Sequence, residues 1–227
     1  MTKINAFLPM RKGSQRIKEK NIKEFAGIAG GLTAIKISQL LKSKNVDNII
    51  VSTDDEEVKK IASSFQSNKI VLDDRPAELA SSRASTDDLI KYVSTLIDEG
   101  LILWTHVTSP FVNEKIYDDL IEKYFENLSK YDSAMTVNKI QTFLWNREGP
   151  INYDRSVEKW PRTQTLSPVY ELNSGAFLAS IDTYREHKDR IGKNPLFYEL
   201  DNKESFDIDW PDDFEIAELI WSKNADI

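Results

Sequence analysis

The chain has 227 residues, a net charge of −7 at pH 7 and no cysteine. This length favours one large domain, the acidic balance argues against general nucleic-acid binding, and the lack of thiols excludes disulfides, thiolate metal sites and thiol nucleophiles. No apolar run reaches membrane-spanning length and the N-terminus lacks a signal-peptide pattern, so we expect a cytoplasmic protein with no membrane partner. His106 and His187 lie far apart, so a bound metal would need carboxylates, which favours Mg²⁺ or Mn²⁺.

The first predicted strand, Ile4 to Leu8, leads into a cationic loop. Between residues 11 and 23 a single acid stands against the cations Arg11, Lys12, Arg16, Lys18, Lys20 and Lys23. Backbone N–H groups of a tight turn at Gly13–Ser14, surrounded by such cations, suit a nucleotide polyphosphate. Arg11 and Lys20 are the preferred phosphate ligands, while a solvated basic turn explains the other cations as well. The loop lacks the P-loop and Gly-x-Gly-x-x-Gly patterns, which disfavours P-loop ATPases and dinucleotide dehydrogenases.

Strands and helices then alternate through the first half of the chain. Apolar residues recur at helical spacing from Thr33 to Lys44, after Thr53–Asp54–Asp55, after Thr86 as a cap, and from Tyr117 to Tyr124. Buried strands are expected at 48–52, 69–72 and 101–107. This alternation predicts an α/β fold with a mostly parallel sheet and helices on both faces. Ligands of such sheets bind at the carboxyl ends of the strands, so the loops that follow the strands are the first candidates for a site.

The alternation stops between Asp132 and Asn173. Strand-like pieces at 133–137 and 143–145 are separated by proline-containing loops without helical periodicity. Because aromatic residues give this part surface to bury, we interpret 133–173 as a small antiparallel insert within a single domain of residues 1–227. A core strand is expected again at 174–180, an alternating strand at 206–210, and a last helix from Asp212, whose acidic first turn suits the helix dipole.

Asp207 and Asp209 are candidate metal ligands. Side chains at i and i+2 of a strand point to the same face. Two neighbouring carboxylates repel each other unless a cation lies between them. An Mg²⁺ ion that also touched nucleotide phosphates would assist a displacement at phosphorus. From spacing alone, ordinary surface acids explain the pair equally well.

Other strand ends and the insert also carry polar groups. Arg75 could reach a phosphate or pair with an adjacent acid, and Ser109, within Thr108–Ser109–Pro110, could meet a base or sugar. His106 precedes this turn, and a lone histidine at a strand end is more often structural than catalytic. Donors suited to a carboxylated sugar are offered by Arg162, Gln164 and Asn173, although a plain polar loop explains them as well.

These motifs together resemble a known family. The opening Leu8-Pro9-Met10-Arg11-Lys12-Gly13-Ser14 with Lys20-Asn21 is similar to that of the acylneuraminate cytidylyltransferases (CMP-sialic acid synthetases). The family's later signatures resemble, in the same order, Val51-Ser52-Thr53-Asp54, Arg75-Pro76-Ala77-Glu78-Leu79-Ala80, Thr108-Ser109-Pro110, Asn173-Ser174-Gly175 and Asp207-Ile208-Asp209. The similarity spans almost the entire chain, which makes it far more specific than any one motif.

The resemblance implies a nucleotidyltransferase with a Rossmann-like fold. In this family the anomeric hydroxyl of a 2-keto sugar acid attacks the α-phosphate of CTP and gives the CMP-sugar and pyrophosphate. The resemblance assigns Mg²⁺ to Asp207 and Asp209 and places Gln164 and Asn173 at the sugar. It also implies that members form homodimers through the antiparallel insert, and that CTP is held by Arg11, Ser14, Lys20 and Asn21.

One departure concerns the sugar. The family commonly has a sugar-reading glutamine where this chain has His106, which leaves the acid open between sialic, legionaminic, pseudaminic or another nonulosonic acid and the eight-carbon Kdo. Two other functions remain as alternatives. A nucleotide-sugar-dependent glycosyltransferase would carry Asp-x-Asp just after a mid-chain strand, a placement not found here. A catalytically silent nucleotide-binding protein would have little need for Arg11, Lys20, Asp207 and Asp209 together.

Overall fold

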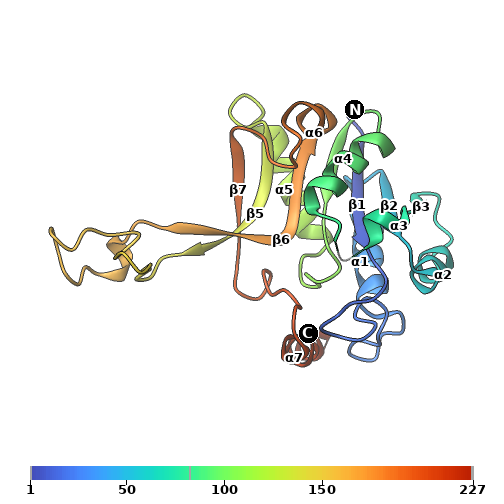
Figure 1. Ribbon diagram of the computed structural model, residues 1–227, viewed down its shortest axis with the longest axis horizontal. Helices are drawn as coiled ribbons and strands as arrows, with labels where there is room; N and C mark the ends of the chain where they lie inside the picture. The colour runs from blue at the N-terminus through green and yellow to red at the C-terminus, as the bar shows by residue number, and fades with distance from the viewer. Residues whose placement is uncertain (1, 82, 226–227) are drawn as a thin grey trace.

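Seven strands of the computed structural model, which describes residues 2–81 and 83–225, form a single mixed sheet (Figure 1). Their order across the sheet is β3–β2–β1–β4–β6–β5–β7. The strands are β1 Ile4–Met10, β2 Asn48–Thr53, β3 Ile70–Asp74, β4 Leu101–Trp104, β5 Ser133–Ile140, β6 Val169–Ser180 and β7 Pro195–Leu200.

The sheet is mostly parallel, as the alternation of elements predicts. β1 pairs in parallel with β2 and β4, β2 with β3, and β5 with β7. β6 alone among these strands runs antiparallel to its neighbours β4 and β5. The carboxyl ends of β1, β2 and β4 therefore meet at one edge of the sheet, the lower edge in Figure 1.

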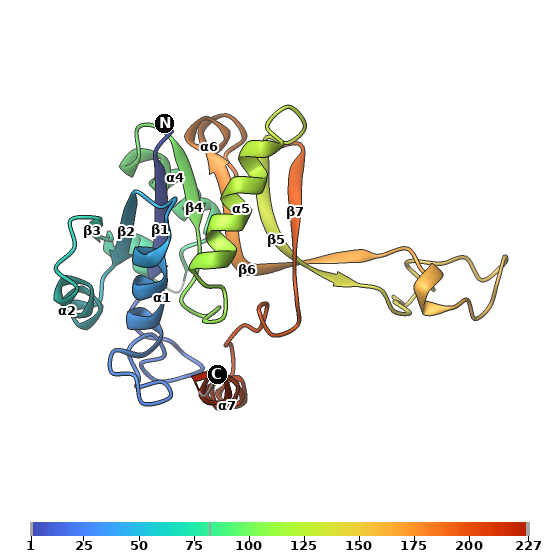
Figure 2. The ribbon, with the colours of Figure 1, turned by 180° about the vertical axis from the view of Figure 1, so that it is seen from behind.

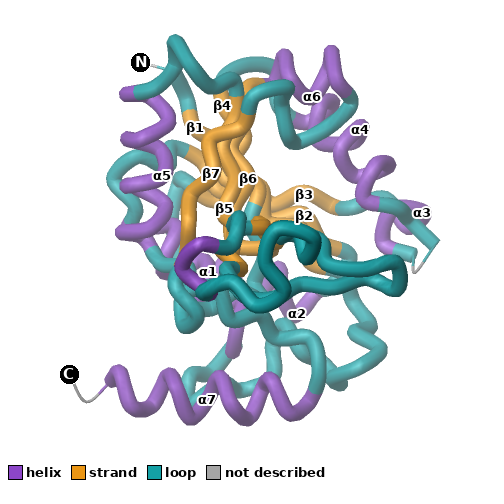
Figure 3. The backbone as a smooth tube through the Cα atoms, turned by 90° about the vertical axis from the view of Figure 1, so that its left-hand side faces the viewer, coloured by secondary structure: helices purple, strands orange, loops and turns teal. Residues whose placement is uncertain are grey.

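Helices cover both faces of the sheet. Figure 2 shows α1 and α5 over one face, and Figure 3 shows α4 and α6 over the other. Among the described residues, no helix combines the length and apolarity that a membrane span needs. The helices are α1 Gly31–Lys42, α2 Glu56–Ser64, α3 Ala77–Ala80, α4 Thr86–Leu96, α5 Glu114–Glu126, η1 Thr163–Thr165 (a 3₁₀ turn), α6 Ile181–His187 and α7 Pro211–Ala225.

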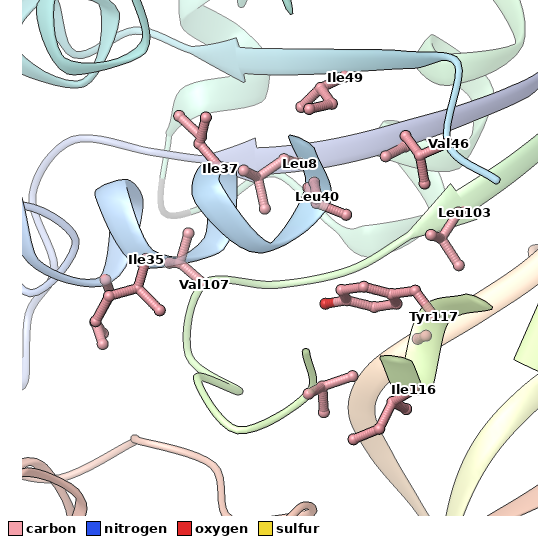
Figure 4. Packing of buried hydrophobic residues seen from close by; sticks show 14 of the residues in the cluster. Leu8, Ile35, Ile37, Leu40, Val46, Ile49, Leu103, Val107, Ile116 and Tyr117 are labelled. Atoms are coloured by element: carbon pink, nitrogen blue, oxygen red, sulfur yellow. The ribbon is translucent and has the colours of Figure 1, made fainter. Parts of the chain in front are cut away.

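Each face of the sheet has its own apolar core. Leu8 packs with Ile37 of α1 and Tyr117 of α5 on one face (Figure 4). Its neighbour Phe7 points to the opposite face and packs with Trp104 beneath α4 and α6. Burial on both faces explains why β1 reads as an almost continuous apolar run rather than an alternating one.

Two helix caps test the predicted starts. The Asp55 side chain accepts a hydrogen bond from the backbone N–H of Glu57 at 3.0 Å, which confirms the expected start of α2. In α4 the cap is Ser85, whose side chain is bonded reciprocally with Asp88 in a capping box. The expectation that Thr86 caps this helix is wrong by one residue, because Thr86 already lies in the first turn.

The predicted insert is an antiparallel ribbon that carries an arm. β5 pairs with β6 from Ser133 opposite Ala179 to Ile140 opposite Val169, and residues 141–168, which we call the arm, project from the body (Figure 1). Residues 133–138 belong to the main sheet because they also pair with β7. The expected strand at 143–145 is wrong. A turn at 146–149 returns the chain after one bridge, between Trp145 and Pro150, which is too short for a ladder.

The segment 206–210 is an extended loop before α7 and not a strand, which corrects the prediction for Asp207 and Asp209. Ile208 is fully buried and its N–H donates to the carbonyl of Thr108 at 2.9 Å. The alternation of apolar and acidic residues in this segment therefore arises from one buried residue, Ile208, between two partly exposed acids. The sequence patterns also do not predict β7 or α6, because β7 begins with a proline at the sheet edge and α6 is only seven residues long.

Candidate active site

The loop after β1, residues 11–21, which we call the β1 loop, encloses a cavity at the carboxyl edge of the sheet. This cavity of about 270 Å³ is lined by Arg11, Ser14, Lys20 and Asn21, and by His106 after β4. An adjoining cavity of about 240 Å³ shares those four loop residues. A larger hollow of about 480 Å³, lined in part by Pro110, contains none of the predicted catalytic, binding or metal-ligating residues.

Backbone and side-chain hydrogen bonds hold the β1 loop in place. The Asn21 amide donates to the carbonyl of Arg11 at 3.2 Å and closes the loop across its base. The Asn21 carbonyl accepts from Thr33 of α1, and the N–H of Lys12 donates to Asp54 Oδ1 at 2.7 Å. The turn at Gly13 has φ 78°, which glycine adopts without strain. Asn21 therefore shapes the loop and also lines the cavity.

Lys20 joins the β1 loop to the segment before α7. Its Nζ donates to the carbonyl of Ile208 at 2.8 Å and lies 3.8 Å from Asp209 Oδ1, with only 12% of the side chain exposed. Burial lowers the pKa of Lys20, and the charges of Asp209 and Asp207 oppose this shift. On the outer side, Arg16 pairs with Asp209 Oδ2 at 3.0 Å and stacks on Trp210. Lys20 is thus a fixed, partly desolvated cation at the cavity.

Asp207 lies against the loop that follows β4. Its Oδ1 accepts a hydrogen bond from the Ser109 hydroxyl at 3.1 Å, and Ser109 is buried. Together with the bond from Ile208 to Thr108, this contact ties residues 207–209 to the end of β4. The structure therefore brings the acid pair together with Lys20 and Ser109, although these residues are up to 189 positions apart in the chain.

The acid pair fits a magnesium ion better than an all-protein metal cage. Within residues 2–81 and 83–225, no group of three or more His, Cys, Asp or Glu side chains is placed to hold a metal. Mg²⁺ is usually held by one or two carboxylates together with waters and substrate phosphates. Asp207 and Asp209 offer that number of ligands beside the cavity. Asp209 is also paired with Arg16 and Lys20, so a metal there would compete with these cations.

A buried lysine behind the site is not predicted by the sequence. Lys36 of α1 is fully buried, and its Nζ bonds to the carbonyls of Ser109 at 2.9 Å and Val112 at 2.7 Å, and to Tyr117 Oη at 2.8 Å. The signal that could have found it is its position, because Lys36 falls between Leu32 and Leu40 on the apolar face of its helix.

The hydrogen bonds around Lys36 require it to be charged. The single hydroxyl hydrogen of Thr105 is donated to the carbonyl of Gly175. In the 2.7 Å contact between Thr105 and Tyr117, the tyrosine hydroxyl is therefore the donor and Thr105 the acceptor. Lys36 must therefore donate all three of its hydrogens, to two carbonyls and to Tyr117 Oη. Burial lowers the pKa of Lys36 well below its ordinary value, and the nearby charge of Asp207 opposes that shift. Lys36 places a positive charge behind Ser109 and Asp207.

His106 contributes a neutral donor to the cavity. The indole N–H of Trp104 can only donate, and it bonds to His106 Nε2 at 2.9 Å. The imidazole proton is thereby assigned to Nδ1. Burial lowers the pKa of His106 to about 3, with Arg190 and Lys36 adding to the shift. The histidine is therefore uncharged at neutral pH.

The remaining predicted residues lie outside the lining of both cavities. Arg75 is buried, and its guanidinium donates to the hydroxyl and carbonyl of Ser52 at 3.2 and 2.6 Å. Asn173 is held within the β5–β6 ribbon, where it accepts from Thr136 at 2.5 Å. Arg162 and Gln164 are exposed in the arm, which Figure 1 shows pointing away from the β1 loop.

A parallel sheet with a cationic loop and an acid pair at its strand ends defines an α/β enzyme that handles nucleotide phosphates. The family model described as Cytidylyltransferase matches residues 6–225. The chain therefore belongs to the cytidylyltransferase family and is a nucleotidyltransferase, as its sequence motifs predict.

Similar proteins narrow the comparison further. An N-acylneuraminate cytidylyltransferase of Escherichia coli O18:K1:H7 is 30% identical, over 98% of this chain and 53% of the relative. A pseudaminic acid cytidylyltransferase of Campylobacter jejuni is 27% identical, over 96% of this chain and 95% of the relative. The chain thus spans about half of the first relative and nearly all of the second. A solved CMP:2-keto-3-deoxy-manno-octonic acid synthetase complexed with CTP shares the fold, with a TM-score of 0.71 and 16% identity over 98% of this chain and all of that one.

Proposed function

We propose that this protein transfers CMP from CTP to a 2-keto-3-deoxy sugar acid of the sialic acid type, giving the CMP-sugar and pyrophosphate. The observation that carries the proposal is Lys20, a largely buried cation held between the cavity of the β1 loop and the carboxylates of Asp207 and Asp209. The relatives named for sialic and pseudaminic acid support the class of acceptor.

The proposed reaction is a displacement at phosphorus. The anomeric oxygen of the sugar acid bonds to the α-phosphorus of CTP, and the bond from that phosphorus to pyrophosphate breaks. Arg11, Ser14 and Lys20 line the cavity and would bind the phosphates. Because Lys20 is held in place and partly desolvated, its charge stabilises the negative charge that develops on the phosphoryl and leaving oxygens without reorganisation.

The acid pair would hold a divalent cation. Asp207, oriented by the Ser109 hydroxyl, and Asp209 would bind Mg²⁺ or Mn²⁺, which when bound neutralises charge on the phosphate oxygens. The Nζ of Lys36 lies behind this serine and donates to the Ser109 carbonyl at 2.9 Å. This bond holds Ser109 in place, and Ser109 in turn orients the Asp207 carboxylate.

The arm is proposed to join two copies of the chain in a cytoplasmic homodimer. It leaves large apolar side chains in water, among them Val157 at 84% and Trp160 at 70% exposure. A second copy is the partner that would cover this surface. In such a dimer Arg162 and Gln164 would be free to approach the partner's sugar site, while Asn173 would act by holding the ribbon.

The test is pyrophosphate release with CTP and Mg²⁺, using Neu5Ac, legionaminic acid, pseudaminic acid and Kdo as acceptors. Release that depends on one acid and on CTP supports the proposal and names the acceptor. Release from CTP and a nucleotide-free sugar also excludes the glycosyltransferase alternative, which consumes a nucleotide sugar. CTP binding without turnover of any acid would favour a silent nucleotide-binding protein or an untried acid, and no CTP binding would overturn the proposal.

A further inference from the structure

Arg190, in the loop between α6 and β7, lies over two aromatic rings. Its Cζ is 3.7 Å from the centroid of the Phe177 ring and 5.2 Å from that of Trp104. These rings are opposite each other on β6 and β4, and both are at most 2% exposed. These cation–π contacts hold the guanidinium against the rings.

The N–H groups of this guanidinium have no acceptor within the described part of the chain. Among the described residues, only the backbone of Arg190 forms a hydrogen bond, to Asp189 Oδ1, and no carboxylate lies within ion-pair distance of the side chain. Burial lowers the pKa of Arg190, and the neighbouring Tyr184 and Asp189 oppose the shift. The half-buried guanidinium of Arg190 therefore keeps its donors available to a ligand, whereas Arg185 on the neighbouring α6 donates to the carbonyls of Ile97 and Asp98.

Trp104 connects Arg190 to the candidate active site. The same indole that supports Arg190 donates to His106 Nε2, and the Trp104 and His106 rings are 6.2 Å apart. His106 lines the cavity together with Arg11 and Lys20. After burial, Arg190 is the strongest influence that lowers the pKa of His106, as expected of a nearby, poorly screened charge. The cavity lining thus includes the cations of the β1 loop, and the guanidinium of Arg190 lies outside this lining, next to the tryptophan that bonds to the cavity's histidine.

We propose that Arg190 binds the carboxylate of the sugar acid through its N–H fork, assisted by the Nδ1–H of His106. A flat guanidinium matches the two coplanar oxygens of a carboxylate better than a tetrahedral phosphate. The phosphates of CTP already have the cations of the β1 loop. This assignment rests on the proposed function, because it takes the second substrate to be an acid.

The competing explanation is structural, since an arginine can simply cover apolar rings with its stem. Arg190→Leu keeps an apolar cover on Phe177 and Trp104 and removes the donors, while Arg190→Lys keeps the charge and removes the fork. The control is Arg185→Leu, which removes an arginine from the same region. Thermal melting checks that all three variants fold.

The measurement is the KM for the accepted sugar acid and for CTP, with the acid's carboxamide analogue as a second acceptor. Arg190→Leu should raise the KM for the acid by about 30-fold or more, with the KM for CTP unchanged, and Arg190→Lys should lie between it and the wild type. For the wild type, the KM for the carboxamide should exceed the KM for the acid by a similar factor. For Arg190→Leu, the KM values for the acid and the carboxamide should be nearly equal. An unchanged KM for the acid, or an equal loss with both substrates, overturns the assignment.

A binding measurement separates this inference from the proposed function. Calorimetric titration of the sugar acids, with a non-hydrolysable CTP analogue present, requires no turnover. If the wild type releases no pyrophosphate but binds an acid in an Arg190-dependent way, the transfer reaction is wrong and the carboxylate site stands. Binding that is equal in the wild type and Arg190→Leu, or absent from both, overturns the carboxylate site.

Discussion

The β1 loop and the arm are both long segments that lie mostly outside the regular elements, but they are held in opposite ways. Hydrogen bonds of the β1 loop reach distant parts of the chain, from Lys20 to the carbonyl of Ile208 and from Lys12 to Asp54. Those of the arm stay within it or its base, as when Asn152 donates to the carbonyls of Thr142 and Ser167. The loop is therefore shaped by the rest of the fold, whereas the arm is organised by itself.

This difference indicates where substitutions should act. Groups that the fold holds around the β1 loop are preorganised, so their loss should affect chemistry or core stability. The exposed apolar groups on the arm, such as Val157 and Trp160, face water in a single copy of the chain, so their loss should affect association instead. The following predictions, ordered from the largest expected effect to the smallest, test this contrast.

Lys20→Met should lower kcat by about 10²–10³-fold, the typical result of removing one preorganised donor from a developing charge. The measurement is steady-state pyrophosphate release. Lys3→Met, at the opposite edge of the sheet and paired with exposed Glu99, is the control and should leave kcat within a factor of about two. A Lys20→Met enzyme as active as this control would show that the β1 loop does not stabilise the transition state.

Lys36→Met should lower the free energy of unfolding by about 1–3 kcal/mol, because it leaves the buried carbonyls of Ser109 and Val112 without a donor. Urea unfolding followed by tryptophan fluorescence measures this. Lys42→Met, exposed at the end of the same helix, should change the value by less than about 0.5 kcal/mol. Equal stability of the two variants would mean that the buried lysine is no better placed than an apolar residue.

His106→Gln should change how stability depends on pH. Since the folded-state pKa of about 3 lies below the ordinary value of 6.5, the unfolded chain binds the extra proton first as pH falls. The wild type should therefore lose stability from about pH 6.5 down towards pH 3, and the variant should lose less. Unfolding curves at pH 7.5 and 4.5 measure the difference. Parallel losses in both proteins would contradict the neutral, buried histidine.

Trp160→Ser, on the arm, should change the free energy of unfolding of a single chain by no more than about 0.5 kcal/mol, because the side chain is mostly exposed. It should instead weaken the proposed dimer, which analytical ultracentrifugation over a concentration series would detect. Leu219→Ser, exposed to a similar degree on α7, is the control and should leave association unchanged. Identical behaviour of the two variants would mean that the arm is not the dimer contact.

Much of the fold follows from local patterns. The strand–helix alternation predicts the parallel sheet because its signals are local. Apolar residues recur at helical spacing in α1, α2 and α5, and short apolar runs mark the buried strands between them. The pattern at 206–210 misleads, because one buried residue, Ile208, imitates a strand. At the candidate site, the cationic loop is visible in sequence because its members are neighbours. Lys36 has a weaker local signal, its position on the apolar face of α1, and no local pattern marks Arg190.

By itself, the sequence determined the class of fold, the position of the phosphate-suited loop and the resemblance to cytidylyltransferases, since each depends on residues close together in the chain. Only the tertiary structure decided that Lys20 meets Asp209 and that Ser109 bonds to Asp207. It also decided that Arg190 stacks on Trp104, the residue that donates a hydrogen bond to His106. Burial and partner choice are properties of contacts between distant segments. For that reason the same residue types, arginine and lysine, are solvated in one place and buried in another.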